Sequence, residues 1–223
     1  MSFAVSRPFA SERTGHGAFV DGRRGASAIA VGGWMESKGA GRTITTLSTR
    51  EVYRNNWLRV REDKILRSNG QQGIYGVIDK DPCAIIIPIE NDRVWLVEQF
   101  RYTIQERSVE LPQGGWEMDG VNPEELARGE LREETGLDAK EMTLLGANWI
   151  AYGVMRQKQY IFLATGLTQT EKDPDPEEHD LMVHSVPAEE FEQMILDGRV
   201  VDGCSVAAWG IYQLWKKKGS AQG

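Results

Sequence analysis

The chain has 223 residues with a net charge of −7 at pH 7, and 40% of its residues are hydrophobic. This length and composition allow one globular domain, or one domain with a small appendage. The acidic balance, without a basic stripe, excludes a nucleic-acid partner, and no apolar run approaches the ~18 residues of a membrane span. An acidic protein that binds a phosphorylated molecule needs a metal ion to mediate the contact.

The two cysteines, Cys83 and Cys204, lack CxxC or metal-ligand spacing. This pattern is typical of reduced structural residues, so we expect a cytoplasmic protein.

Residues 1–46 are rich in Gly, Ser and Arg and have few periodic apolar positions. This composition predicts a disordered tail. From residue 47 the pattern favours strands: residues 57–63 alternate, and residues 73–79 follow a turn signal at Asn69-Gly70. Residues 47–80 therefore predict a small antiparallel sheet, too small to be stable alone.

Two apolar runs follow, at residues 83–89 and 93–100, with Asn91-Asp92 between them. Their length and composition predict central strands joined by a hairpin turn.

Residues 114–137 combine a glycine loop with a helix. Asn122 is a good N-cap, Pro123 suits the first helical position, and Gly136 is the expected left-handed end. On this helix Glu130, Glu133 and Glu134 stand at i, i+3 and i+4, within an arc of roughly 100°. Three crowded carboxylates repel one another, and hard oxygen ligands suit Mg²⁺ or Mn²⁺. The alternative is a solvated acidic face.

The stretch from Gly115 to Leu137 resembles the signature of the Nudix hydrolases, a glycine loop followed by a helix ending in Arg-Glu-Leu-x-Glu-Glu-x-Gly-Leu. Two positions depart from it, because this chain has Val121 for Glu and Gly129 for Arg. In the family these side chains form an ion pair that ties the loop to the helix. Losing both leaves no orphan charge, although a helical Gly costs roughly 0.5–1 kcal/mol relative to Ala.

Two further patches resemble the ADP-ribose pyrophosphatase and nucleotide-sugar hydrolase branch of that family. They are Gln99-Phe-Arg101 and Glu110-Leu-Pro-Gln-Gly, and the likeness spans about residues 50–215. The resemblance implies that Arg101 and Glu110 contact the substrate. A local ion pair between them is an equally good interpretation.

Beyond the helix, residues 142–150 and 157–163 predict strands, and Gln157 stands where this branch carries a carboxylate. The acidic segment 171–180 is interpreted as a solvated loop, with Glu177 or Glu178 as an alternative source of the missing base. Residues 181–186 predict a last strand and residues 187–196 an amphipathic helix. A closing helix is expected at 205–215, with Val206, Trp209 and Leu214 facing the core.

Together these elements predict an α/β protein, in which a Nudix α/β/α sandwich around a mixed sheet occupies residues 81–218 after the small sheet. The resemblance implies metal-dependent hydrolysis of the pyrophosphate bond in a nucleoside diphosphate linked to another moiety, with ADP-ribose or a nucleotide sugar as the expected substrate. Mg²⁺, or alternatively Mn²⁺, is expected on the carbonyl of Gly114 and on Glu130, Glu133 and Glu134. Glu133 and Glu134 are the expected catalytic residues, and a homodimer is expected.

Two alternatives stay open. Residues 112–115 also resemble Nudix enzymes that act on dinucleoside polyphosphates. A regulatory Nudix domain that holds a nucleotide without cleaving it is favoured by Val121, Gly129 and Gln157 and opposed by the three glutamates.

Overall fold

The computed structural model describes residues 43–115, 120–170 and 180–220. Most of the predicted tail therefore lies outside the described residues. Its predicted boundary at residue 46 is wrong, because the first strand begins at Ile44. The β-branched residues at positions 44–46 pair with the next strand. The local sequence does not reveal that this pairing partner is available.

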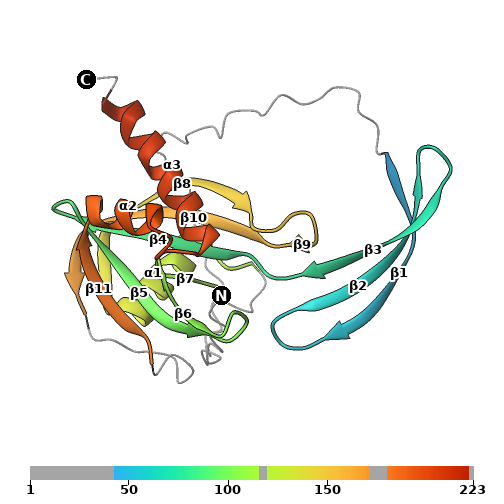
Figure 1. Ribbon diagram of the computed structural model, residues 1–223, viewed down its shortest axis with the longest axis horizontal. Helices are drawn as coiled ribbons and strands as arrows, with labels where there is room; N and C mark the ends of the chain where they lie inside the picture. The colour runs from blue at the N-terminus through green and yellow to red at the C-terminus, as the bar shows by residue number, and fades with distance from the viewer. Residues whose placement is uncertain (1–42, 116–119, 171–179, 221–223) are drawn as a thin grey trace, which may run out of the picture.

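The chain folds into two sheets (Figure 1). The smaller sheet has the order β1-β2-β3-β9, and it extends away from the larger one. Its strands are β1 (Ile44–Arg54), β2 (Arg59–Arg67), β3 (Gln72–Asp79) and β9 (Met155–Arg156). The first three pair antiparallel, which confirms the predicted small antiparallel sheet, and β9 adds a short parallel pairing with β3.

The larger sheet has the order β11-β5-β4-β10-β8, with β6 on β5 and β7 on β4. Its strands are β4 (Cys83–Glu90), β5 (Arg93–Arg101), β6 (Glu106–Glu110), β7 (Gln113–Gly114), β8 (Leu137–Trp149), β10 (Lys158–Gln169) and β11 (Met182–Pro187). β4 and β10 are parallel, and the other pairs are antiparallel, so the sheet is mixed as predicted. Asn91 and Asp92 both have positive φ at the β4–β5 hairpin, as a tight turn there requires.

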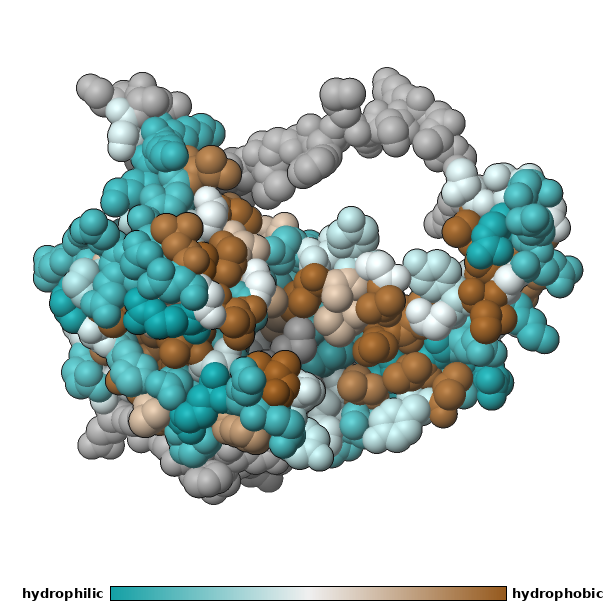
Figure 2. Space-filling model, viewed as in Figure 1, coloured by the Kyte–Doolittle hydropathy of each residue, from teal (hydrophilic) through white to brown (hydrophobic). Residues whose placement is uncertain are grey.

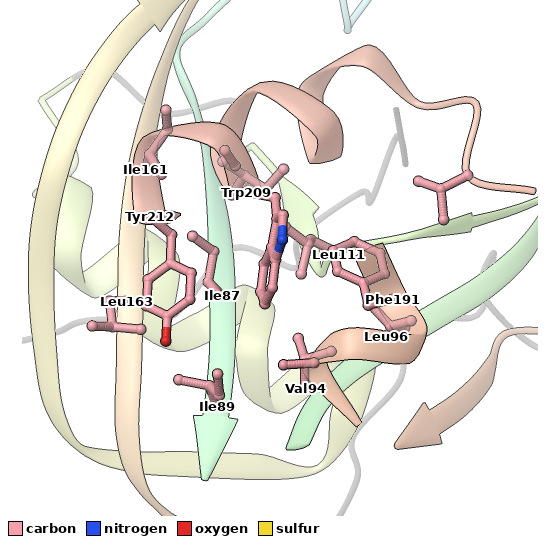
Figure 3. Close-up of a cluster of buried hydrophobic side chains, with 14 of the residues drawn as sticks. Ile87, Ile89, Val94, Leu96, Leu111, Ile161, Leu163, Phe191, Trp209 and Tyr212 are labelled. Atoms are coloured by element: carbon pink, nitrogen blue, oxygen red, sulfur yellow. The ribbon is translucent and has the colours of Figure 1, made fainter. Parts of the chain in front are cut away.

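Helices cover both faces of the larger sheet, which gives the predicted α/β/α sandwich. The helices are α1 (Pro123–Thr135), α2 (Ala188–Leu196) and α3 (Gly203–Ser220). Side chains alternate along β4: Ala84 and Ile86 belong to the core under α1, whereas Ile85 and Ile87 belong to the core under α2 and α3. Figure 3 shows the second core, where Phe191 of α2 meets Trp209 of α3 edge to face, with ring centroids 5.0 Å apart.

The predicted inward face of α3 is partly wrong. Trp209 is buried, but Val206 is 38% and Leu214 68% exposed. Ser205, Ala208 and Tyr212 lie beside Trp209 on the buried face instead. The spacing i, i+3, i+4 and i+7 defines this face, and two small residues in it let the helix approach the sheet closely.

Among the helices of the described residues, none combines the length and apolar character needed to cross a membrane.

Candidate active site

Helix α1 forms as the sequence predicts. The side chain of Asn122 accepts a hydrogen bond from the backbone N–H of Glu124 at 2.9 Å. Gly136 ends the helix with φ of 71°, and its N–H donates to the carbonyl of Arg132 at 2.8 Å. A short helix with both ends fixed holds its side chains in a defined orientation.

The acidic face of α1 points largely inward. Glu130 is 1% and Glu134 0% exposed, while Glu133 is half-buried. A solvated acidic face is therefore the wrong interpretation for two of the three glutamates. Burying carboxylates is costly unless they are paired or bind a cation, so this face is built for polar chemistry.

The glycine segment lies directly against these carboxylates. A Cβ on Gly114 would come within 2.2 Å of Glu130 Oε2, so any larger residue here would force the Glu130 carboxylate to move. The backbone N–H of Gln113 donates to Glu134 Oε2 at 2.9 Å. The structure thus brings Gly114, Glu130 and Glu134 together, with Glu133 one turn from Glu130 on the same helix.

The donor set fits a hard divalent cation in chemistry, because the carboxylates of Glu130 and Glu134 and the backbone carbonyl of Gly114 are all hard oxygen donors. As positioned, no three carboxylate, imidazole or thiol side chains converge closely enough to hold an ion anywhere in residues 43–115, 120–170 and 180–220. Like charges spread apart until a cation neutralises them, so we expect metal binding to draw these carboxylates together.

Arg101 and Glu110 form a buried ion pair. Arg101 Nε donates to Glu110 Oε1 at 2.7 Å, and a second bond joins Nη2 to Oε2. Burial opposes both charges, but the pairing prevails: the pKa of Glu110 is lowered and the pKa of Arg101 is raised from their ordinary values. The local ion pair is confirmed, and contact of either residue with a substrate stays a prediction.

Sequence reasoning missed a buried polar network behind this pair. Gln113 Nε2 donates to Glu110 Oε2 at 3.2 Å and to Asp202 Oδ2 at 2.7 Å. Gln159, which is fully buried on β10, donates to Gln113 Oε1 at 3.2 Å. An Asp shortly before a helical run is an N-cap signal, which would have identified Asp202 but not its partner.

Gln157 has a structural bond in this fold. It is buried, and its Nε2 donates to the carbonyl of Asp81 at 2.9 Å, which ties the start of β10 to the segment before β4. The alternative bases Glu177 and Glu178 lie outside the described residues.

At the two positions that depart from the Nudix signature, the structure has apolar contacts instead of an ion pair. Val121 packs against the core cluster under α1, and Gly129 is buried on that helix. Hydrophobic contact therefore holds the end of the glycine loop where the family uses an ion pair.

Cys83 and Cys204 are both free thiols. Burial raises the pKa of Cys83 to about 12 and that of Cys204 to about 11, so both stay protonated. This supports the structural role predicted for them, because the thiolate is the reactive form.

A pocket of about 440 Å³ opens between the two sheets, lined in part by Trp57 and Trp149. Five cationic side chains also line it: Arg54, Arg59, Lys80, Arg156 and Lys158. Pro82 is another wall residue, and a Cβ on Gly115 would lie 3.0 Å from its carbonyl oxygen. The pocket therefore adjoins the glycine segment, and positive charge predominates in it.

Comparisons with known proteins agree with this geometry. Residues 79–204 match the NUDIX domain, and residues 44–78 match the nucleoside diphosphate sugar hydrolase N-terminal domain.

The curated relatives are distant but cover most of the chain. The ADP-ribose pyrophosphatase of Mycobacterium tuberculosis is 27% identical over 169 residues, covering 73% of this chain and 79% of the relative. That of Bacillus subtilis is 26% identical over 172 residues, covering 76% and 92%. The methanol dehydrogenase activator of Bacillus methanolicus is 26% identical over 171 residues, with the same coverage.

Among solved structures, that of an ADP compounds hydrolase has a TM-score of 0.71 at 22% identity, covering 80% of this chain and 96% of the other. This likeness shows a shared fold. The chain belongs to the Nudix hydrolase family, as a Nudix-type pyrophosphohydrolase that carries the N-terminal domain of the nucleoside diphosphate sugar hydrolases.

Proposed function

We propose that this enzyme uses a divalent metal ion to cleave the pyrophosphate bond of a nucleoside diphosphate linked to another moiety. ADP-ribose and nucleotide sugars are the leading candidate substrates. The observation that carries the proposal is the burial of Glu130 and Glu134 against the glycine segment. The names of two relatives and of the N-terminal domain support the substrate class.

In this proposal Glu130, Glu133, Glu134 and the carbonyl of Gly114 would hold Mg²⁺, with Mn²⁺ as the alternative. A bound ion of this kind neutralises the pyrophosphate and lowers the pKa of an attacking water. Glu133 is the half-buried member of the three glutamates, so water reaches it. We propose that it is the general base that accepts a proton from the attacking water.

The pocket between the sheets is the proposed place for the rest of the substrate. Its cationic side chains suit phosphate oxygens, and the indole rings of Trp57 and Trp149 offer faces on which a base can stack. Arg101 and Glu110 are buried and do not line this pocket, and we propose that the pair recognises the part of the substrate nearest Glu134, whose charge acts on Arg101.

A homodimer is proposed as the working assembly. Apolar side chains gather over the small sheet in Figure 2, and Leu47, Val52 and Ile74 are at least half exposed there. Exposed apolar area of this kind marks an interaction surface. Two protonated free thiols suit a reducing compartment, and we place the protein in the cytoplasm.

One substrate panel tests the proposal. ADP-ribose, nucleotide sugars, dinucleoside polyphosphates and NADH are each incubated with Mg²⁺ and with Mn²⁺, and Glu134→Gln is the control protein. We expect the largest kcat/KM for ADP-ribose or a nucleotide sugar, and almost none in the control.

Two outcomes would redirect the proposal. Preference for a dinucleoside polyphosphate would establish the alternative substrate class that residues 112–115 suggest. Tight binding of a nucleotide, measured by calorimetry, with no cleavage under either metal would establish the regulatory alternative.

A further inference from the structure

The segment that faces the carboxylates of α1 is held from behind by α3. Its strand β7 is only two residues long, and it pairs with β4 through Ala84↔Gly114 and Ile85↔Gln113. A ladder this short fixes the backbone weakly. The N–H of Leu111 also donates to Ser205 Oγ at 2.8 Å, so the first turn of α3 contacts the segment directly.

The side chain of Gln113 is fixed at three points. Its Nε2 donates to Asp202 and Glu110, and its Oε1 accepts from Gln159. It is 5% exposed, so water does not compete effectively for these bonds. The backbone N–H of this same residue donates to Glu134 Oε2. Fixing the side chain therefore fixes the direction of the N–H that holds Glu134.

Asp202 anchors this arrangement to the helix. Its Oδ2 accepts from the N–H of Ser205 at 2.9 Å and from Ser205 Oγ at 2.7 Å, and its Oδ1 accepts from the N–H of Cys204 at 3.2 Å. These are N-cap bonds at the start of α3, which is 18 residues long and packed into the core by Trp209. Asp202 is therefore a rigid support for Gln113.

We propose that Gln113 and Asp202 are positioning residues, through which the N-terminus of α3 holds the carboxylate of Glu134 in the orientation that a divalent metal site needs. This inference rests on the proposed function, because Glu134 is a ligand there. Removal of a residue that orients a metal ligand by hydrogen bonding typically weakens metal affinity by about 10–100-fold. A residue 89 positions away in sequence from Gln113 would thus tune the metal site.

The competing explanation is that the network serves stability alone. In that case its loss lowers the melting temperature and leaves metal affinity unchanged. Metal affinity measured without substrate distinguishes the two explanations, because a purely structural bond does not change it in a folded protein.

The test uses Gln113→Met, which keeps side-chain volume, and Asp202→Ser, which keeps an N-cap but is too short to reach Gln113. Mn²⁺ is titrated into the full-length protein and followed by electron paramagnetic resonance. We expect each variant to bind Mn²⁺ about 10–100-fold more weakly. The Mn²⁺ affinity of the double variant should be no lower than that of the single variant with the lower affinity, because both changes break the same hydrogen bond between Gln113 and Asp202.

Glu192→Ala is the matched control. Glu192 Oε1 accepts from Trp209 Nε1 at 3.2 Å and from Gln213 Nε2, so its hydrogen bonds tie α2 to α3 and involve no residue of the glycine segment. This variant should lose stability and keep the Mn²⁺ affinity of the parent. The positioning inference is overturned if either Gln113→Met or Asp202→Ser binds Mn²⁺ as tightly as Glu192→Ala does.

Glu134→Gln separates failure of the inference from failure of the proposed function. If Glu134→Gln loses Mn²⁺ binding while Gln113→Met and Asp202→Ser both keep it, the metal site stands and the positioning role is wrong. If Glu134→Gln itself binds Mn²⁺ like the parent, the metal assignment fails and the inference fails with it.

Discussion

Strand β1 of the small sheet and strand β4 of the large sheet have opposite patterns of burial. All eleven residues of β1 are exposed, whereas seven of the eight residues of β4 are buried. The large sheet has helices on both faces and supplies its own core. The small sheet relies on its ladder and on ion pairs such as Arg59 with Asp79. The difference indicates that the large sheet supplies most of the folding stability, and that the small sheet has surface left for a partner.

The largest expected effect lies beside β4, at the proposed metal site. Glu134→Gln should lower kcat by at least about a hundredfold, since it removes the negative charge of a proposed metal ligand. Far-ultraviolet circular dichroism should show an intact fold, because the amide can still accept from Gln113. Steady-state turnover of the preferred substrate is the measurement. Activity within threefold of the parent would contradict the metal assignment.

Ion pairs in the two regions should differ almost as strongly. Glu110→Gln should destabilise the fold by about 3–5 kcal/mol at pH 7, because it leaves the charge of Arg101 buried and unpaired. Glu62→Gln breaks the exposed pair with Arg50 and should cost at most about 1 kcal/mol. Urea denaturation of both variants measures the difference, and equal losses would remove the contrast between the regions.

The same Glu110 pair should give a pH dependence. Burial alone would raise the pKa of Glu110, but hydrogen bonding to Arg101 lowers it below its ordinary value of 4.5. Its stabilisation is therefore present above pH 4.5 and is lost as pH falls through the folded-state pKa. The gap in melting temperature between parent and Glu110→Gln should close on acidification, and a gap that stays constant would exclude this role.

Side-chain truncations should sharpen the comparison next. Ile87→Ala in β4 should cost about 2–5 kcal/mol, because it opens a cavity in a fully buried core. Val52→Ala in β1 should fall within about 0.5 kcal/mol of the parent, since Val52 is 52% exposed. Denaturant midpoints at constant m-value measure both. Both costs refer to the monomer at low protein concentration, and a large cost at Val52 there would mean that β1 is covered within a single chain.

The smallest effect on the stability of the folded chain is expected for a substitution that dissociates the proposed dimer. Val52→Asp places a charge on the exposed apolar surface of the small sheet and should dissociate the proposed dimer. Leu196→Asp, at an exposed apolar site on α2, should leave the dimer intact. Sedimentation velocity gives the mass of each. A dimer that survives Val52→Asp would place the interface elsewhere.

Local sequence determined much of this protein. The cap at Asn122, the stop at Gly136, the turn at Asn91-Asp92 and the apolar runs of β4 and β5 were all predictable, because each depends on contacts within a few residues. The spacing of the three glutamates likewise followed from helical periodicity.

Tertiary structure decided the rest. Whether Glu130 and Glu134 are buried, which face of α3 meets the sheet, and where Gln113 finds Asp202 all depend on packing between distant segments. Val206 and Leu214 fit a helical apolar pattern, yet they are exposed because the sheet contacts the neighbouring face. Local periodicity specifies which residues share a face, whereas only the assembled core specifies what that face contacts.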